Sequence, residues 1–236
     1  MSLELSQLQT AHTREQQPLL SVPLSLRADP GTLWVLAGRN GAGKSTLLNT
    51  VCGLMSAYSG AVKWNGMDVQ AMDPVSRSAI FALVFTARPA AGSFTAHELT
   101  GTALFRRHDL DESARDERIQ SALETAGAAA FAHRLFGSLS DGEKQKVLLA
   151  RALAQDTPVL LLDEPSAFLD FAAKRELAFL LKKLTVEQGK LTIVSTHDTE
   201  VFLPIADYLL FLQQNGEAQL LEKPAQNAGT ATLFTP

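Results

Sequence analysis

Cysteine is almost absent from the sequence. Cys52 is the only one among 236 residues, so the chain cannot form an internal disulfide or hold a metal through several thiolates. It lies within a segment that we expect to be helical, where a lone thiol is typical of a small buried side chain.

An excess of positive charge and long apolar runs are also missing. The chain has 21 Lys and Arg against 25 Asp and Glu, a net charge of −4, and no basic stripe, which argues against nucleic acid as a partner. The longest apolar runs, 79–85 and 159–162, are far shorter than the ~18 residues of a membrane-spanning helix. No export signal opens the sequence. We therefore expect a cytoplasmic chain whose role at a membrane, if it has one, is peripheral.

A glycine-rich stretch fits the pattern G-x-x-x-x-G-K-[ST]. It reads Gly38, Arg39, Asn40, Gly41, Ala42, Gly43, Lys44, Ser45 and Thr46. Its glycines allow backbone N–H groups to turn inward, and the amino end of the following helix favours an anion. Lys44 is expected to reach the β- and γ-phosphates of a nucleotide, and the Ser45 hydroxyl to bind Mg²⁺. A turn with an incidental lysine is the alternative, but an apolar strand at 33–37 and a helix at 45–52 favour the phosphate cradle.

The order of strands and helices predicts an α/β fold. Alternating residues at 3–5 and 22–26 indicate antiparallel strands near the N-terminus. Apolar runs at 80–85, 159–162 and 191–196, with a helix at 174–188, indicate a mostly parallel sheet. Ligands of such sheets bind beyond the carboxyl ends of the strands.

The character of the chain changes between about 87 and 156. Residues 113–126 place Ile119, Ala122, Leu123 and Ala126 on one helical face, and 147–154 is alanine-rich and helical in pattern. We therefore expect one domain with two parts: a core lobe formed by 1–86 and 157–236, and an inserted helical subdomain at 87–156.

Two acidic residues follow the apolar run 159–162. Asp163 is placed to hold Mg²⁺ through water, and Glu164 to act as the general base on an attacking water. An acidic turn before Pro165 is the simpler interpretation, but the phosphate cradle requires an acidic site on a neighbouring strand.

The stretch 139–143 reads Leu-Ser-Asp-Gly-Glu. Ser140 and Glu143 have the spacing of a capping box at the start of a helix. The start of a helix that carries serine and glycine is also an anion site. If it faced the γ-phosphate held by another copy of the chain, it would complete a composite active site.

These motifs together resemble the nucleotide-binding subunits of ATP-binding cassette (ABC) transporters, which have a P-loop NTPase (RecA-like) fold. The stretch 38–46 resembles the Walker A motif and 160–164 resembles Walker B. Residues 139–143 resemble the signature motif, with LSDGE for the common LSGGQ. Residues 166–170 resemble the D-loop, which ends at Asp170. His197 stands where the family has its switch histidine. The resemblance implies two copies in a head-to-tail sandwich, with each ATP between one cradle and the partner's Ser140 and Gly142.

Two positions depart from the family pattern. Thr86 stands where the family has a glutamine that touches Mg²⁺ and the attacking water, so it could reach the metal only through a water. His12 stands where the family has an aromatic residue that stacks on adenine, and a solvated loop histidine is an equal alternative.

The resemblance implies a Mg²⁺-dependent ATP hydrolase that powers a separate membrane permease at the inner face of the cell membrane. Three features look like those of the ATPases of iron-siderophore, haem and cobalamin importers: the LSDGE signature, Thr86 and the stretch 164–171. The resemblance to such importers also implies a substrate-binding protein as an indirect partner. Two alternatives stay open: a soluble cassette ATPase of ribosomes or DNA repair, and a degenerate cassette that binds ATP as a regulator.

Overall fold

A mixed six-stranded sheet forms the centre of the protein. The structure is a computed structural model and describes residues 1–11, 17–85 and 91–226. The strand order is β10-β9-β3-β8-β7-β6, in which only β9 and β10 pair antiparallel. The bounds are β3 (Leu33–Gly38), β6 (Phe81–Val84), β7 (Val159–Asp163), β8 (Leu191–Ser195), β9 (Tyr208–Leu212) and β10 (Ala218–Glu222).

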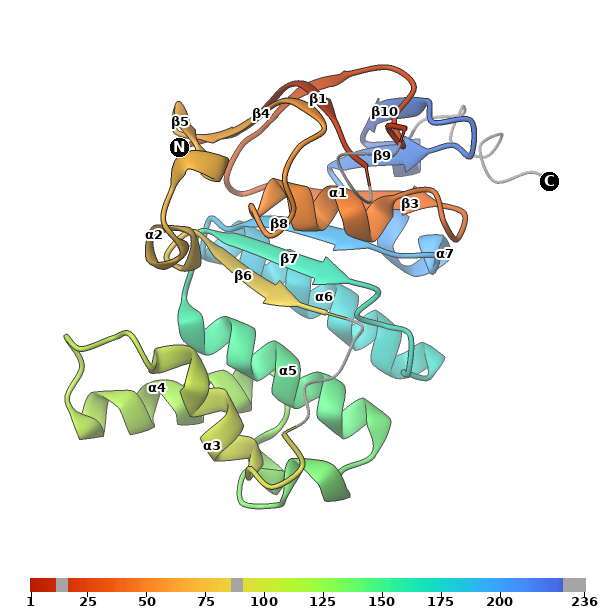
Figure 1. Cartoon of the computed structure of the whole chain (residues 1–236). Coiled ribbons are helices and arrows are strands. Elements are labelled where there is room, and N and C mark those ends of the chain that lie inside the picture. The colour runs from red at the N-terminus through yellow and green to blue at the C-terminus, as the bar shows by residue number, and fades with distance from the viewer. Residues whose placement is uncertain (12–16, 86–90, 227–236) are drawn as a thin grey trace.

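Helices cover both faces of this sheet. The helices α1 (Lys44–Val51) and α6 (Phe171–Glu187) lie on opposite sides of it (Figure 1). Side chains of β3 alternate between the two resulting cores, because successive residues of a strand point to opposite faces. Val35 packs in the core that contains Leu181 of α6, whereas Leu36 packs with Leu47 of α1.

A second sheet of four antiparallel strands packs over α1. Its order is β2-β1-β4-β5, with β1 (Leu3–Gln9), β2 (Leu24–Ala28), β4 (Ser59–Trp64) and β5 (Met67–Asp68). The sequence predicts a strand from Val22, but β2 begins after Pro23 and Val22 is exposed. Proline has no N–H to donate to a strand ladder, which accounts for the later start.

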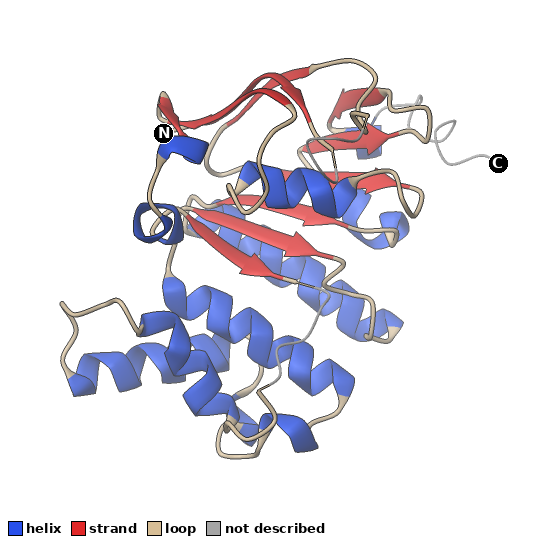
Figure 2. Cartoon of the chain, viewed as in Figure 1, coloured by secondary structure: helices blue, strands red, loops and turns tan. Residues whose placement is uncertain are grey.

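Helices fill the segment between β6 and β7, as Figure 2 shows below the sheet. They are α3 (Ala96–Gly101), α4 (Glu112–Thr125) and α5 (Asp141–Gln155). The predicted apolar face of α4 is buried. The helix α3 has no counterpart among the predicted elements, although Thr95 and Glu98 form a capping box at its start. The short helices α2 (Pro74–Ser78) and α7 (Thr199–Phe202) complete the fold.

The predicted fold class is confirmed: α/β with a mostly parallel sheet, N-terminal antiparallel strands and inserted helices. The exact division at 86/87 and 156/157 stays a prediction. Within the described ranges, no helix is both long and apolar enough to cross a membrane.

Candidate nucleotide site at the carboxyl edge of the sheet

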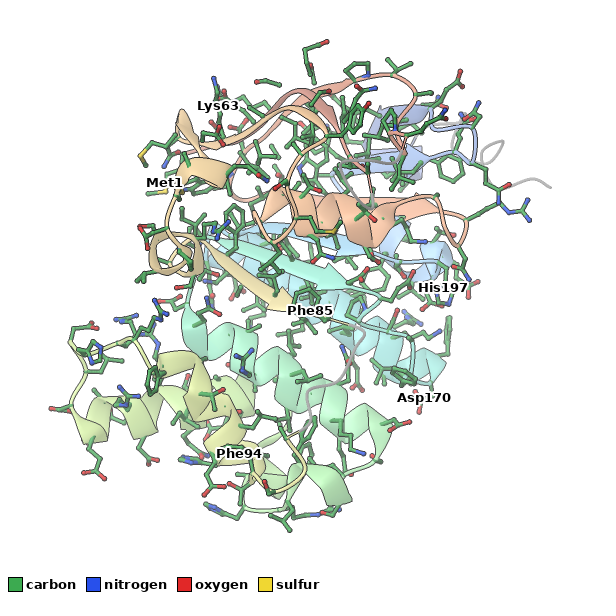
Figure 3. The ribbon with its side chains drawn as sticks, in the orientation of Figure 1. Met1, Lys63, Phe85, Phe94, Asp170 and His197 are labelled. Atoms are coloured by element: carbon green, nitrogen blue, oxygen red, sulfur yellow. The ribbon has the colours of Figure 1, made fainter. Side chains whose placement is uncertain are left out.

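Three neighbouring strands bring the predicted site residues to one edge of the sheet. In the pairing register, Ser195 of β8 lies opposite Leu36 of β3 and Asp163 of β7. The segments that follow these strands therefore emerge side by side. They carry the cradle, His197 and Glu164. Figure 3 shows His197 on this edge of the molecule, with Asp170 below it.

The cradle connects β3 to α1. Gly38 and Gly43 have φ values of +153° and +94°, which glycine adopts without the penalty of a side chain. The residue before α1 is Gly43, so no side chain caps the first turn of the helix. Because the first amides of a helix lack partners within it, this amino end is open to an anion such as phosphate.

Lys44 joins the cradle to the acidic strand end. Its side chain is only 7% exposed, and its Nζ donates to the carbonyl oxygen of Gly38 at 2.9 Å. The same Nζ lies 3.6 Å from Oε1 of Glu164. A buried ammonium group requires such partners, and phosphate oxygens would supply stronger ones.

Glu164 is held in an unusual backbone conformation. Its φ is +49°, in the left-handed region that non-glycine residues rarely adopt. Its N–H donates to the carbonyl oxygen of Ser195 at 3.0 Å, and its Oε2 lies 2.7 Å from Nδ1 of His197. Strained conformations of this kind cluster at functional sites because the surroundings must enforce them. Here the conformation of Glu164 turns its carboxylate toward Lys44.

Two oxygen groups on this edge fit a magnesium ion. Asp163 ends β7 and accepts a hydrogen bond from the Ser195 hydroxyl, while Ser45 is an exposed residue in the first turn of α1. In the described part of the chain, no cluster of three or more His, Cys, Asp or Glu could hold a metal by itself. Mg²⁺ in nucleotide sites uses one or two protein oxygens, such as these two, together with substrate phosphates and water.

The signature stretch forms the predicted capping box. Ser140 Oγ accepts from the N–H of Glu143 at 3.3 Å, and Oε2 of Glu143 accepts from the N–H of Ser140 at 2.7 Å. The pKa of the Glu143 carboxyl is lowered, and the hydrogen bond from the Ser140 N–H is the largest cause. Ser140 is exposed and Gly142 half-buried at the amino end of α5, away from the cradle of the same chain (Figure 1).

The remaining predicted residues have different outcomes. Asp170 caps α6, where its Oδ1 accepts from the N–H of Ala173 at 2.8 Å. His12 and Thr86 lie outside the described residues. Ser195 is a site residue that the motifs do not predict: its hydroxyl donates to Asp163 and accepts from the N–H of Glu164 at 3.2 Å. The run of polar residues at the end of β8 was the available signal.

The fold and this edge define a class of protein: a P-loop nucleotide hydrolase, in which a strand, a glycine-rich loop and a helix hold phosphate beside acidic strand ends. The comparisons narrow the class. The family model of ABC transporters matches residues 22–167. The chain therefore belongs to the ABC transporter ATP-binding family, whose members are ATPases.

Two relatives and one solved structure illustrate the similarity. The uncharacterized ABC transporter ATP-binding protein MJ0873 of Methanocaldococcus jannaschii is 36% identical over 81% of this chain and 67% of that protein. The iron(3+)-hydroxamate import ATP-binding protein FhuC of Bacillus subtilis is 34% identical over 81% of this chain and 72% of that protein. The dimeric structure of the cassette MJ0796 superposes with a TM-score of 0.83 at 28% identity, covering 94% of this chain and 98% of that one.

Proposed function

We propose that this chain is the ATP-hydrolysing subunit of an importer whose membrane permease is a separate protein. The observation that carries the proposal is the convergence of Lys44, Glu164 and His197 beside the cradle. This convergence supports the proposal because hydrolysis needs a cation for the phosphates beside a base for the water.

The residues divide the chemistry of ATP hydrolysis among them. The cradle amides and Lys44 bind the β- and γ-phosphates and stabilise the charge of the transferring phosphoryl group. Glu164 accepts a proton from the attacking water, and His197 holds the Glu164 carboxylate in place. Ser45 and Asp163 would hold Mg²⁺, with Thr86 near it through water, and the ion would add charge stabilisation when bound.

A second copy of the chain is the proposed partner at this edge. Ser140 and Gly142 are accessible but do not reach the cradle of their own chain, so a head-to-tail dimer is what would bring them to ATP. The same proposal assigns Asp170 to the D-loop and His12 to stacking on the adenine. The dimeric arrangement of the related cassette MJ0796 supports it.

The proposed docking site for the permease is a groove between α2, α5 and the segment after α3. This cavity has a volume of about 740 Å³ and contains Phe105, which is 77% exposed. Arg106 and Arg151 line it and have no ion-pair partner among the described residues. Burial lowers the pKa of the Arg151 guanidinium, which donates to Thr102 Oγ1 at 2.9 Å. We therefore infer that the occupant is an acidic, partly apolar segment on the cytoplasmic side of the permease.

The proposed cargo is an iron chelate of the siderophore class, with haem and cobalamin as related possibilities. The name of the relative FhuC, an iron(3+)-hydroxamate import protein, supports this class. The cargo itself would be selected by the permease and by a substrate-binding protein. In this arrangement the chain lies on the inner face of the membrane through its permease contact.

One experiment tests the function in stages. The ATPase rate of the purified chain is measured against protein concentration with Mg²⁺, and then in vesicles that contain the permease and a binding protein loaded with iron hydroxamate. We expect a rate that rises more steeply than protein concentration, and ATP-dependent uptake of iron. A chain that binds ATP but never hydrolyses it would be a regulatory cassette. If the chain hydrolyses ATP but does not bind the permease, and the permease does not change its ATPase rate, the result would favour a soluble cassette ATPase.

A further inference from the structure

A half-buried ion pair connects three segments beside the proposed site. Asp198 follows His197, Ser166 lies in the turn after Glu164, and Lys174 lies near the start of α6. Lys174 Nζ donates to Oδ1 of Asp198 at 2.6 Å, and Ser166 Oγ donates to Oδ2 at 2.6 Å. The side chains of Lys174 and Asp198 are 20% and 11% exposed, and Ser166 is fully buried.

Asp198 is charged in this cluster. Burial alone would raise the pKa of its carboxyl, but the hydrogen bonds from Lys174 and then Ser166 hold the pKa below its usual value. Lys174 is the only lysine or arginine in ion-pair distance of Asp198 in the described part of the chain. Removing the Lys174 ammonium would therefore leave a largely buried carboxylate with a single side-chain donor, the Ser166 hydroxyl, which is unfavourable.

The cluster fixes the position of the backbone next to His197. The N–H of Asp198 donates to Thr196 Oγ1 at 2.9 Å, and its carbonyl oxygen accepts from Val201 at the start of α7. The His197 side chain is 58% exposed, so the packing around its ring does little to hold it. Its orientation toward Glu164 depends on the placement of this backbone.

The same carboxylate also holds the turn that follows Glu164. Ser166, bonded to Asp198, belongs to that turn, in which the N–H of Ala167 donates to the carbonyl oxygen of Glu164 at 3.2 Å. One carboxylate thus ties together the segments of both Glu164 and His197. The ammonium of Lys174 reaches it from a helix that carries neither residue.

We propose that Lys174 is a positioning residue for ATP hydrolysis. By fixing Asp198 it sets the relative positions of Glu164 and His197, without any contact to the cradle. This inference rests on the proposed function only in taking Glu164 as the general base. A displacement of about 1 Å in a reacting group can lower a rate by about two orders of magnitude, so a loosened cluster should be visible in kcat.

The test compares Lys174→Met with Lys182→Met. Lys182 lies on the same helix and pairs with Asp207 at 2.9 and 2.8 Å, with side chains 30% and 36% exposed, but next to β9 rather than beside Glu164. Each substitution removes one ammonium from one ion pair of α6. We expect Lys174→Met to lower kcat about tenfold or more, with KM for ATP and nucleotide affinity within about twofold of the unchanged chain. Lys182→Met should keep the unchanged kcat.

Two further variants separate positioning from folding. Lys174→Arg retains the charge and should recover most of kcat. The double variant Lys174→Met, Asp198→Asn removes both half-buried charges and should be more stable to urea than Lys174→Met alone. Equal losses of kcat in Lys174→Met and Lys182→Met, or a rise in KM with unchanged kcat, would overturn the proposal.

A spectroscopic readout keeps this test independent of hydrolysis. In the nucleotide-free chain labelled at histidine, the ring signals of His197 should shift in Lys174→Met and stay unchanged in Lys182→Met. Unchanged His197 signals in both variants overturn the positioning role, whatever the ATPase rate. A chain that shifts as expected but hydrolyses no ATP contradicts the proposed function instead.

Discussion

His197 Nδ1 lies 2.7 Å from Oε2 of Glu164, while the other oxygen of that carboxylate lies 3.6 Å from Nζ of Lys44. Glu164 is therefore held on both sides, by an imidazole and by an ammonium group. Lys44 reaches it from the start of α1 and His197 from the segment after β8, and the backbone of Glu164 is itself in the left-handed region. A carboxylate held in this way needs little reorganisation to accept a proton from water beside the phosphates.

Glu164→Gln should abolish hydrolysis while ATP binding is retained. An amide is nearly the same size as the carboxylate but cannot accept the proton, so we expect kcat to fall by at least about 100-fold. Nucleotide affinity should change little, and the trapped MgATP state should elute as a dimer on gel filtration. Phosphate release and elution volume are the measurements.

Glu187→Gln is the matched control for that prediction. Glu187 is 62% exposed at the end of α6 and pairs with Lys183 at 4.0 Å. It should retain full hydrolysis. A Glu164→Gln chain with unchanged kcat would show that another group activates the water, and one that stays monomeric with MgATP would contradict the head-to-tail dimer.

Local patterns made most of the fold predictable from the sequence. The apolar face of α4 and the motifs at the ends of β3 and β7 depend on residues close together in the chain. The capping box of Ser140 and Glu143 is a four-residue pattern, and the structure confirms it. Such features need no knowledge of tertiary contacts.

The contacts that hold the site together were beyond the sequence analysis. The bond of Lys174 to Asp198 joins residues 24 positions apart, and that of Ser195 to Asp163 joins residues 32 apart. The first requires the packing of α6 and the second requires the pairing of β7 with β8, and no local pattern specifies either. The positive φ of Glu164 is likewise set by its surroundings, since Pro165 signals a turn there but does not specify a left-handed residue.

Stability at low pH should depend on Asp198. Because its folded pKa lies below the ordinary value of 3.8, the stabilisation from its charge is complete above pH 3.8 and is lost as the pH falls through the folded value. Asp198→Asn should therefore be less stable than the unchanged chain at pH 5–7, and the difference should shrink below about pH 4. Urea unfolding midpoints across this range measure it. A difference independent of pH would show that the charge of Asp198 does not contribute.

Leu181→Ala should destabilise the whole domain. Leu181 is fully buried between α6 and the sheet, so truncation removes apolar contacts and leaves a cavity that costs about 2–5 kcal/mol. Phe179→Ala on the same helix is the control, because Phe179 is 61% exposed and should change stability by about 0.5 kcal/mol or less. Thermal and urea unfolding give both values. Similar losses for the two variants would mean that the face containing Phe179 is also covered.

Arg106→Glu should weaken the permease contact without affecting the isolated chain. Arg106 lines the groove beside Phe105 and has no ion-pair partner in the described ranges, so reversing its charge places like charges against an acidic occupant. We expect about tenfold weaker association, with a smaller effect at high salt, because the charge lies at the rim. The ATPase rate of the chain alone should be unchanged. Arg175→Glu makes the same change of charge on α6, outside the groove, and should bind normally. If both reversals weaken binding equally, the effect comes from net charge and the permease docks elsewhere.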